Sequence, residues 1–202
     1  ANRGLCGAFN SSVIKKSIAL SQKLEKQGLE VKFFAIGKKS RDLLSKTGKV
    51  EGENIDVVNG VTFEGAEAIA QIAMENYLSG KYDKVIMVYN QFRNAAVQIL
   101  QEEQLLPFVE APKENNEVAD YIYEPDARQL IEGLVTRFIE SQVYQSVVEN
   151  SACEQAAKMV AMKSATENAE KLIDELRLIY NNARQAAITQ EIAEIVGGAA
   201  AV

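Results

Sequence analysis

Residues 159–195 read MVAMKSATENAEKLIDELRLIYNNARQAAITQEIAEI, and this stretch decides the fold of the second half of the chain. It belongs to a longer segment, from Asp126 to Val196, that contains no proline and a single glycine, Gly133. Because nothing in this segment forces a break, the sequence predicts one continuous helix. Such a helix would be roughly 100 Å long, several times the width of a small domain. Much of it is therefore expected to leave its own globule and contact a partner.

A stripe of mostly apolar and small residues follows the predicted helix in alternating steps of three and four. This spacing is typical of the seam of a left-handed coiled coil, in which two helices wrap around each other. The long helix is thus expected to supply one half of a coiled coil. The seam residues are Met159, Met162, Thr166, Ala169, Ile173, Leu176, Tyr180, Ala183 and Ala187.

The end of the helix carries few charges. From residue 184 to residue 202 only Arg184, Glu191 and Glu194 are charged, which is too few for a water-exposed tail of this length. We therefore expect protein around it. A polar group enclosed in this way costs free energy unless it finds a hydrogen bond. The candidates for such partner-binding contacts are Arg184, Gln185, Thr189, Gln190 and Glu191.

Residues 1–125 alternate between strand and helix patterns, which indicates an α/β globular domain followed by a helical domain over residues 126–202. Lys84–Tyr89 (KVIMVY) is an apolar run suited to a buried parallel strand, whereas the two strands after it are expected to be antiparallel. The fold predicted is a Rossmann-like mixed sheet flanked by helices. Helices are expected over residues 10–28, 40–47 and 62–80, and strands at Leu29–Ile36, Asn54–Val58, Lys84–Tyr89, Val97–Leu106 and Val118–Tyr123.

Composition excludes some classes of function. The net charge of −6 and the absence of a concentrated basic cluster argue against nucleic-acid binding. The apolar C-terminal end, Ile192 to Val202, falls far short of the ~20 residues that a membrane span needs, so no direct membrane insertion is expected. Cys6 and Cys153 lie far apart in the sequence and form neither a disulfide framework nor a metal motif.

A catalytic centre is not expected in this chain. Histidine, the commonest general base and metal ligand, is absent. Gly4 and Gly7 stand at a strand-to-helix junction where doubly wound folds hold phosphates, but their spacing is not the dinucleotide fingerprint, and no Walker A motif occurs. We therefore expect no catalytic residue, no cofactor and no metal.

Two motifs carry a family resemblance. Residues 156–169 (AAKMVAMKSATENA) and 176–199 (LRLIYNNARQAAITQEIAEIVGGA) closely resemble the C-terminal helix of the F-type ATP synthase gamma subunit, and residues 3–10 (RGLCGAFN) resemble the loop after that family's first strand. The motifs stand in the order found in the family. In that family a long N-terminal helix and a strand precede the loop, so the sequence is expected to be a gamma subunit that lacks both.

The resemblance implies a mechanical function. The C-terminal helix would form an antiparallel coiled coil inside the hexamer of alpha and beta subunits, and the globule would sit against the epsilon subunit and the ring of c subunits. Proton flow would turn this shaft, which would drive the catalytic sites of the beta subunits through their changes in nucleotide affinity. Lys158, where the family usually carries arginine, joins the residues expected to contact beta-subunit loops. The complex would lie on the cytoplasmic face of the bacterial inner membrane.

Two other classes remain open at this point. A coiled-coil scaffold protein that does not rotate would also explain the seam. A nucleotide-binding α/β enzyme would explain the glycines of the first loop.

Overall fold

The computed structural model describes residues 1–108 and 127–199, and it divides the chain into two compact units. The first unit, Ala1–Val160, holds the strands and the shorter helices, and the second, Ala161–Val202, contains the end of the last helix. The elements are α1 (Phe9–Glu25), β1 (Phe33–Ile36), α2 (Lys38–Leu44), β2 (Val50–Asn54), α3 (Phe63–Leu78), β3 (Val85–Phe92), β4 (Gln98–Leu106) and α4 (Ala127–Ala199), with 3-10 turns at Ser45–Thr47 and Asp56–Val58.

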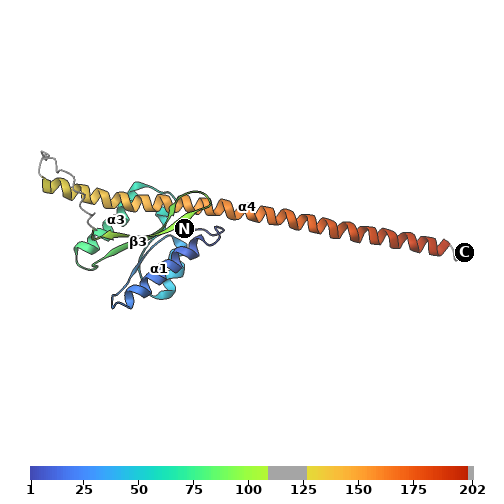
Figure 1. The fold of residues 1–202 in the computed structure, drawn as a ribbon, viewed down its shortest axis with the longest axis horizontal. Helices are drawn as coiled ribbons and strands as arrows, with labels where there is room; N and C mark the ends of the chain where they lie inside the picture. The colour runs from blue at the N-terminus through green and yellow to red at the C-terminus, as the bar shows by residue number, and fades with distance from the viewer. Residues whose placement is uncertain (109–126, 200–202) are drawn as a thin grey trace, which may run out of the picture. The chain divides into compact units, whose positions relative to one another are not determined.

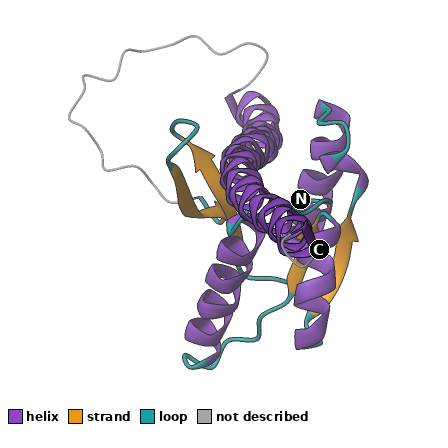
Figure 2. Cartoon of the chain, turned by 90° about the vertical axis from the view of Figure 1, so that its right-hand side faces the viewer, coloured by secondary structure: helices purple, strands orange, loops and turns teal. Residues whose placement is uncertain are grey.

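The strands of the first unit pair in two groups, which Figure 2 shows in orange. Strand β1 pairs with β2 in parallel, and β3 pairs with β4 antiparallel. The α/β class, with both parallel and antiparallel pairs, is therefore as predicted. The expectation of a parallel strand at residues 84–89 was wrong in the pairing recorded for the described residues, because strand β3 continues through the polar Asn90 and Gln91 to Phe92 and forms an antiparallel hairpin with β4.

Two other strands lie at positions that differ from the predicted ones. The strand expected at Leu29–Ile36 begins only at Phe33. The strand expected at Asn54–Val58 is found earlier, at Val50–Asn54, so it ends at the residue where it was expected to begin. The side chain of Asn54 accepts a hydrogen bond from the backbone N–H of Val57, and this local bond turns the chain into a 3-10 turn. The strand expected at Val118–Tyr123 lies outside the described residues.

The helix starts show which local signals were decisive. Helix α3 is capped as its sequence suggests, because the Thr62 hydroxyl accepts a hydrogen bond from the backbone N–H of Gly65 at 3.2 Å. Helix α1 is not capped by a serine. Its hydroxyls at Ser11 and Ser12 donate to the carbonyls of the preceding turn instead, so the helix begins earlier, at Phe9.

One apolar core joins α3, β4 and the first part of α4. Ala66 and Ala70 of α3 are fully buried, and the small side chains let this helix approach its neighbours closely. Figure 1 shows α3 and β3 beside the yellow part of α4. A face of α4 at spacings of four enters the same core. Its buried residues are Ile139, Val143 and Val147.

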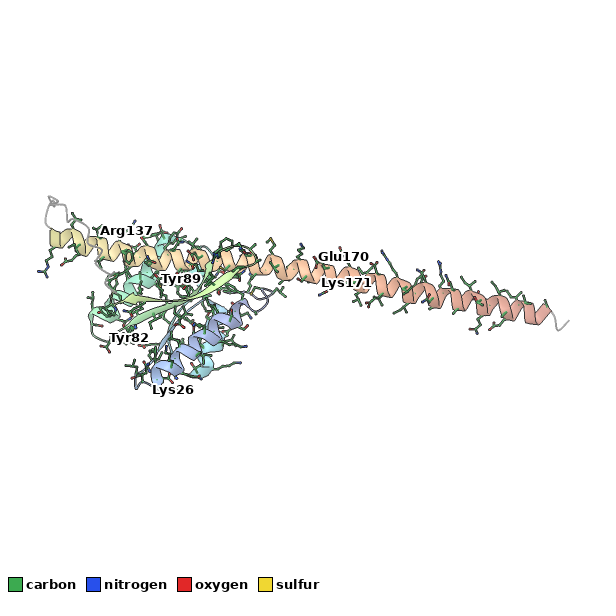
Figure 3. The ribbon with its side chains drawn as sticks, in the orientation of Figure 1. Lys26, Tyr82, Tyr89, Arg137, Glu170 and Lys171 are labelled. Carbon is green, nitrogen blue, oxygen red and sulfur yellow. The ribbon has the colours of Figure 1, made fainter. Side chains whose placement is uncertain are left out.

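Helix α4 continues without a break from residue 127 to residue 199, as the sequence predicted. In the second unit every described residue from Met162 to Ala199 is exposed. Figure 3 shows side chains projecting from this part of the helix, with Glu170 and Lys171 labelled. A helical stretch of this length with no packing partner among the described residues is unusual, because packing supplies most of a helix's stability.

Candidate functional site

The predicted seam lies bare on helix α4. Met159 is 58% exposed, Leu176 55% and Tyr180 65%. Among the described residues, nothing in the second unit covers these side chains. An apolar stripe of this length is the mark of an interaction surface rather than of a solvated helix.

The one polar residue in the middle of the seam is already satisfied. The hydroxyl of Thr166 donates to the carbonyl of Met162 in the preceding turn at 3.1 Å. Covering Thr166 with a partner therefore leaves no unpaired donor at this position, so its hydroxyl does not oppose burial of the seam. This bond supports the interpretation of residues 159–187 as a surface built to be buried.

The polar residues near the end of α4 do not share one face. At about 100° per residue, Arg184 and Glu191 project within about 20° of each other, Gln185 and Thr189 lie on a neighbouring side, and Gln190 points elsewhere. A partner on one side could not reach all of them. The arrangement fits a helix that is contacted from several directions.

Two of these residues already make bonds within the helix. The Thr189 hydroxyl donates to the carbonyl of Gln185 at 2.8 Å, and the Gln190 amide donates to Glu194 at 3.0 Å. Thr189 can therefore offer a partner only its remaining acceptor capacity. Lys158 stands apart from this group, half-buried in the first unit, so the predicted contacts fall into two separate places.

Sequence reasoning missed a second apolar surface, at the beginning of α4. Ile131, Leu134 and Phe138 are at least half exposed, and the ring of Phe138 packs against Phe108 with centroids 5.6 Å apart. A shallow groove at this surface is lined by Phe108, Leu134, Val135 and Phe138, together with Arg137 and Ser141. The signal was present in the sequence, because residues 131, 134 and 138 repeat the same three-and-four spacing as the seam.

The glycine-rich first loop is organised by its own contacts. Leu5 and Gly7 both have positive φ, at 65° and 58°, and the side chain of Asn10 closes the loop by donating to the carbonyl of Arg3 and to the Cys6 sulfur. Within residues 1–108 and 127–199 there is also no group of acidic, cysteine or histidine side chains placed to hold a metal. The geometry of the described residues therefore directs attention to surfaces for other proteins.

Comparison with known proteins agrees with this emphasis. The model of the ATP synthase family matches residues 1–202. The ATP synthase gamma chain of Flavobacterium johnsoniae is 47% identical over 204 residues, which cover 100% of this chain and 70% of that one. This chain belongs to the ATP synthase gamma-chain family.

Solved structures share the fold. A chain from the central stalk and c-ring of the Tetrahymena thermophila mitochondrial ATP synthase is 26% identical, with a TM-score of 0.61 over 82% of this chain and 73% of that one. A chain from the Euglena gracilis mitochondrial enzyme, in a structure of OSCP, F1 and c-ring, reaches a TM-score of 0.69 over 100% of this chain and 70% of that one, at 24% identity.

The family settles the choice between the three classes considered from the sequence. A gamma chain is a noncatalytic subunit of the rotary F-type ATP synthase, so the scaffold and nucleotide-enzyme alternatives are set aside. It is a peripheral part of a membrane-bound complex. Within the residues that the structure describes, no helix has both the length and the apolarity to cross a bilayer.

Proposed function

We propose that this chain is the rotating shaft that couples proton flow through a membrane ring to ATP synthesis or hydrolysis. The observation that carries the proposal is the uncovered seam on an unbroken helix of 73 residues. A gamma chain with such a helix transmits force by contact and performs no chemistry itself. Residues 126–202 act as the shaft, and residues 1–125 act as the foot that receives the torque.

The partners follow from this division. The alpha and beta subunits of the catalytic hexamer surround the end of α4, and the epsilon subunit and the c-subunit ring hold the foot. The central stalk and c-ring of the Tetrahymena relative support this assignment. Because the relative at 47% identity is bacterial, we place the complex on the cytoplasmic face of the inner membrane.

The polar side chains of α4 engage the beta subunits at particular angles of rotation. Arg184, Gln185, Thr189, Gln190 and Glu191 face several directions, which suits a shaft that presents a different side to each beta subunit in turn. Lys158 contributes a positive charge nearer the foot. Each contact favours one conformation of a neighbour at one angle, and this differential contact is what changes nucleotide affinity.

A reversible cross-link tests the function. Gln190→Cys places a thiol on the exposed end of α4, and in the assembled complex we expect it to form a disulfide with a cysteine introduced on a beta-subunit loop. ATP hydrolysis should stop when the link forms and recover when it is reduced, because a rotor tied to its stator cannot turn. Lys26→Cys, at the exposed end of α1, is the matched control and should give no link to beta.

Full hydrolysis in a complex whose chains are shown to be linked would contradict the shaft function. The absence of any Gln190→Cys link to beta would contradict the placement of α4 inside the hexamer.

A further inference from the structure

Helix α4 is hydrogen-bonded to the backbone of strand β3 at Asn90. The backbone N–H of Asn90 donates to the side-chain oxygen of Asn150 at 3.3 Å, and the Asn90 side-chain amide donates to the same oxygen at 3.4 Å. The thiol of Cys153 donates to the carbonyl of Asn90 at 3.4 Å. Asn90 is 3% exposed and Cys153 is 0% exposed, so these bonds are shielded from water.

These contacts occupy one edge of the strand. In a β-strand the N–H and C=O of one residue point to the same side, toward one neighbour. Both groups of Asn90 are taken by α4, whose residues 150 and 153 lie one turn apart on the same side of the helix. At this position α4 therefore stands where another strand would otherwise pair, and it satisfies backbone groups that would be costly to bury unbonded.

The other contacts of α4 with this unit are mainly apolar. Ile139, Val143 and Val147 pack into the core, and Ser146 lies against the sulfur of Met87. Only one face of α4 is apolar, so this packing sets the rotation of the helix about its own axis coarsely, to within the width of that face. Hydrogen bonds have preferred angles and distances, so those at Asn90, at 3.3–3.4 Å, narrow that rotation further.

The Cys153 thiol is protonated, as a hydrogen-bond donor to Asn90 must be. Burial, with a smaller contribution from the nearby Glu149 carboxylate, raises the pKa of Cys153 to about 11. Near neutral pH the sulfur therefore keeps its hydrogen and remains a donor toward the Asn90 carbonyl. Cys153 acts here as a hydrogen-bond donor and not as a reactive thiolate.

We propose that Asn90, Asn150 and Cys153 form a clamp that sets the angle of the shaft on the foot and carries torque between them. This role rests on the proposed rotary function. A slip of α4 by one residue would rotate its faces by about 100°. Lys158 and Met159, the next functional positions along the same helix, would then point in the wrong direction. All three members are positioning residues, because they act through the orientation of α4.

Hydrogen exchange tests the clamp directly. In the assembled complex, Asn150→Ala should speed exchange of the Asn90 backbone N–H by roughly fivefold to tenfold, because the side-chain oxygen that accepts its hydrogen bond is removed. Amides elsewhere in the β3–β4 ladder should keep their rates. Thr136→Ala is the matched control, because its exposed hydroxyl bonds only within α4.

The ratio of protons pumped to ATP hydrolysed tests whether the clamp transmits torque. Serine and alanine differ little in size, but only serine can donate to the Asn90 carbonyl. Cys153→Ser should therefore keep the wild-type ratio, and Cys153→Ala and Asn150→Ala should lower it by about twofold or more, through slippage. If Asn150→Ala fails to assemble, the Cys153 pair decides.

Equal ratios for Cys153→Ser and Cys153→Ala, or an unchanged Asn90 exchange rate in Asn150→Ala, would overturn the clamp. A wild-type complex that hydrolyses ATP without pumping would instead contradict the rotary function on which the clamp rests. The two failures are therefore distinguishable.

Discussion

At the scale of single residues, the most direct targets are the polar side chains near the end of α4, which are exposed in this chain and proposed to be enclosed by beta subunits in the complex. Gln185→Ala and Thr189→Ala should each lower ATP hydrolysis of the assembled complex, because the loss of one partner from a desolvated hydrogen bond costs roughly 1–3 kcal/mol. Gln185→Ala should have the larger effect. The Thr189 hydroxyl already donates its hydrogen to the Gln185 carbonyl, so it can only accept a hydrogen bond from a partner. Steady-state hydrolysis measures both. Ser164→Ala, exposed and away from the seam, is the control. Unchanged turnover in both variants would remove these residues from the site.

Residue-scale features of the fold were harder to foresee than these candidates. The clamp at Asn90 joins residues 60 positions apart, so no local pattern could have indicated it. Gly52 is a similar case. A Cβ at that position would lie 2.7 Å from the ring of Phe34 on the neighbouring strand, so glycine is needed there for a reason that only the β1–β2 pairing reveals. Glycine is uncommon in strands, and no strand was expected at this position from the sequence.

At the scale of elements, helix α3 offers a stability test. Thr62→Ala removes the side-chain cap on the backbone N–H of Gly65 and should lower the free energy of unfolding of the first unit by about 1 kcal/mol. The effect should spread beyond the helix, because α3 supplies Ala66, Ile69 and Ala70 to the core. Urea unfolding followed by tyrosine fluorescence measures it, since the chain has no tryptophan. Thr136→Ala should change stability by less than about 0.5 kcal/mol. An equal loss in both variants would show that the cap contributes nothing of its own.

The elements also show where sequence patterns suffice. Helix α4 could be predicted almost to its ends, because a long segment without proline needs no information from elsewhere in the chain. The orientation of β3 could not, because an apolar run suits a parallel or an antiparallel neighbour equally and the choice depends on β4. The start of α1, one residue before the predicted one, has a related explanation. Serine hydroxyls can cap a helix or bond back into it, and the position of Cys6 and Phe9 in a small buried cluster, with Cys153, favours the earlier start.

At the scale of the whole molecule, the 202-residue chain alone should be ordered in its first unit and weakly protected in its second. The cores around Ala66 and Val143 protect backbone amides of the first unit, whereas the helix from Met162 to Ala199 has no packing among the described residues to stabilise it. Hydrogen exchange at a concentration where the chain is monomeric should therefore be fast over residues 162–199 and slow around residues 139–147. In the assembled complex the same region should become strongly protected, because the seam is then covered. Strong protection of residues 162–195 in the free monomer would mean that this helix needs no partner, and the interpretation of the seam as a binding surface would fail with it.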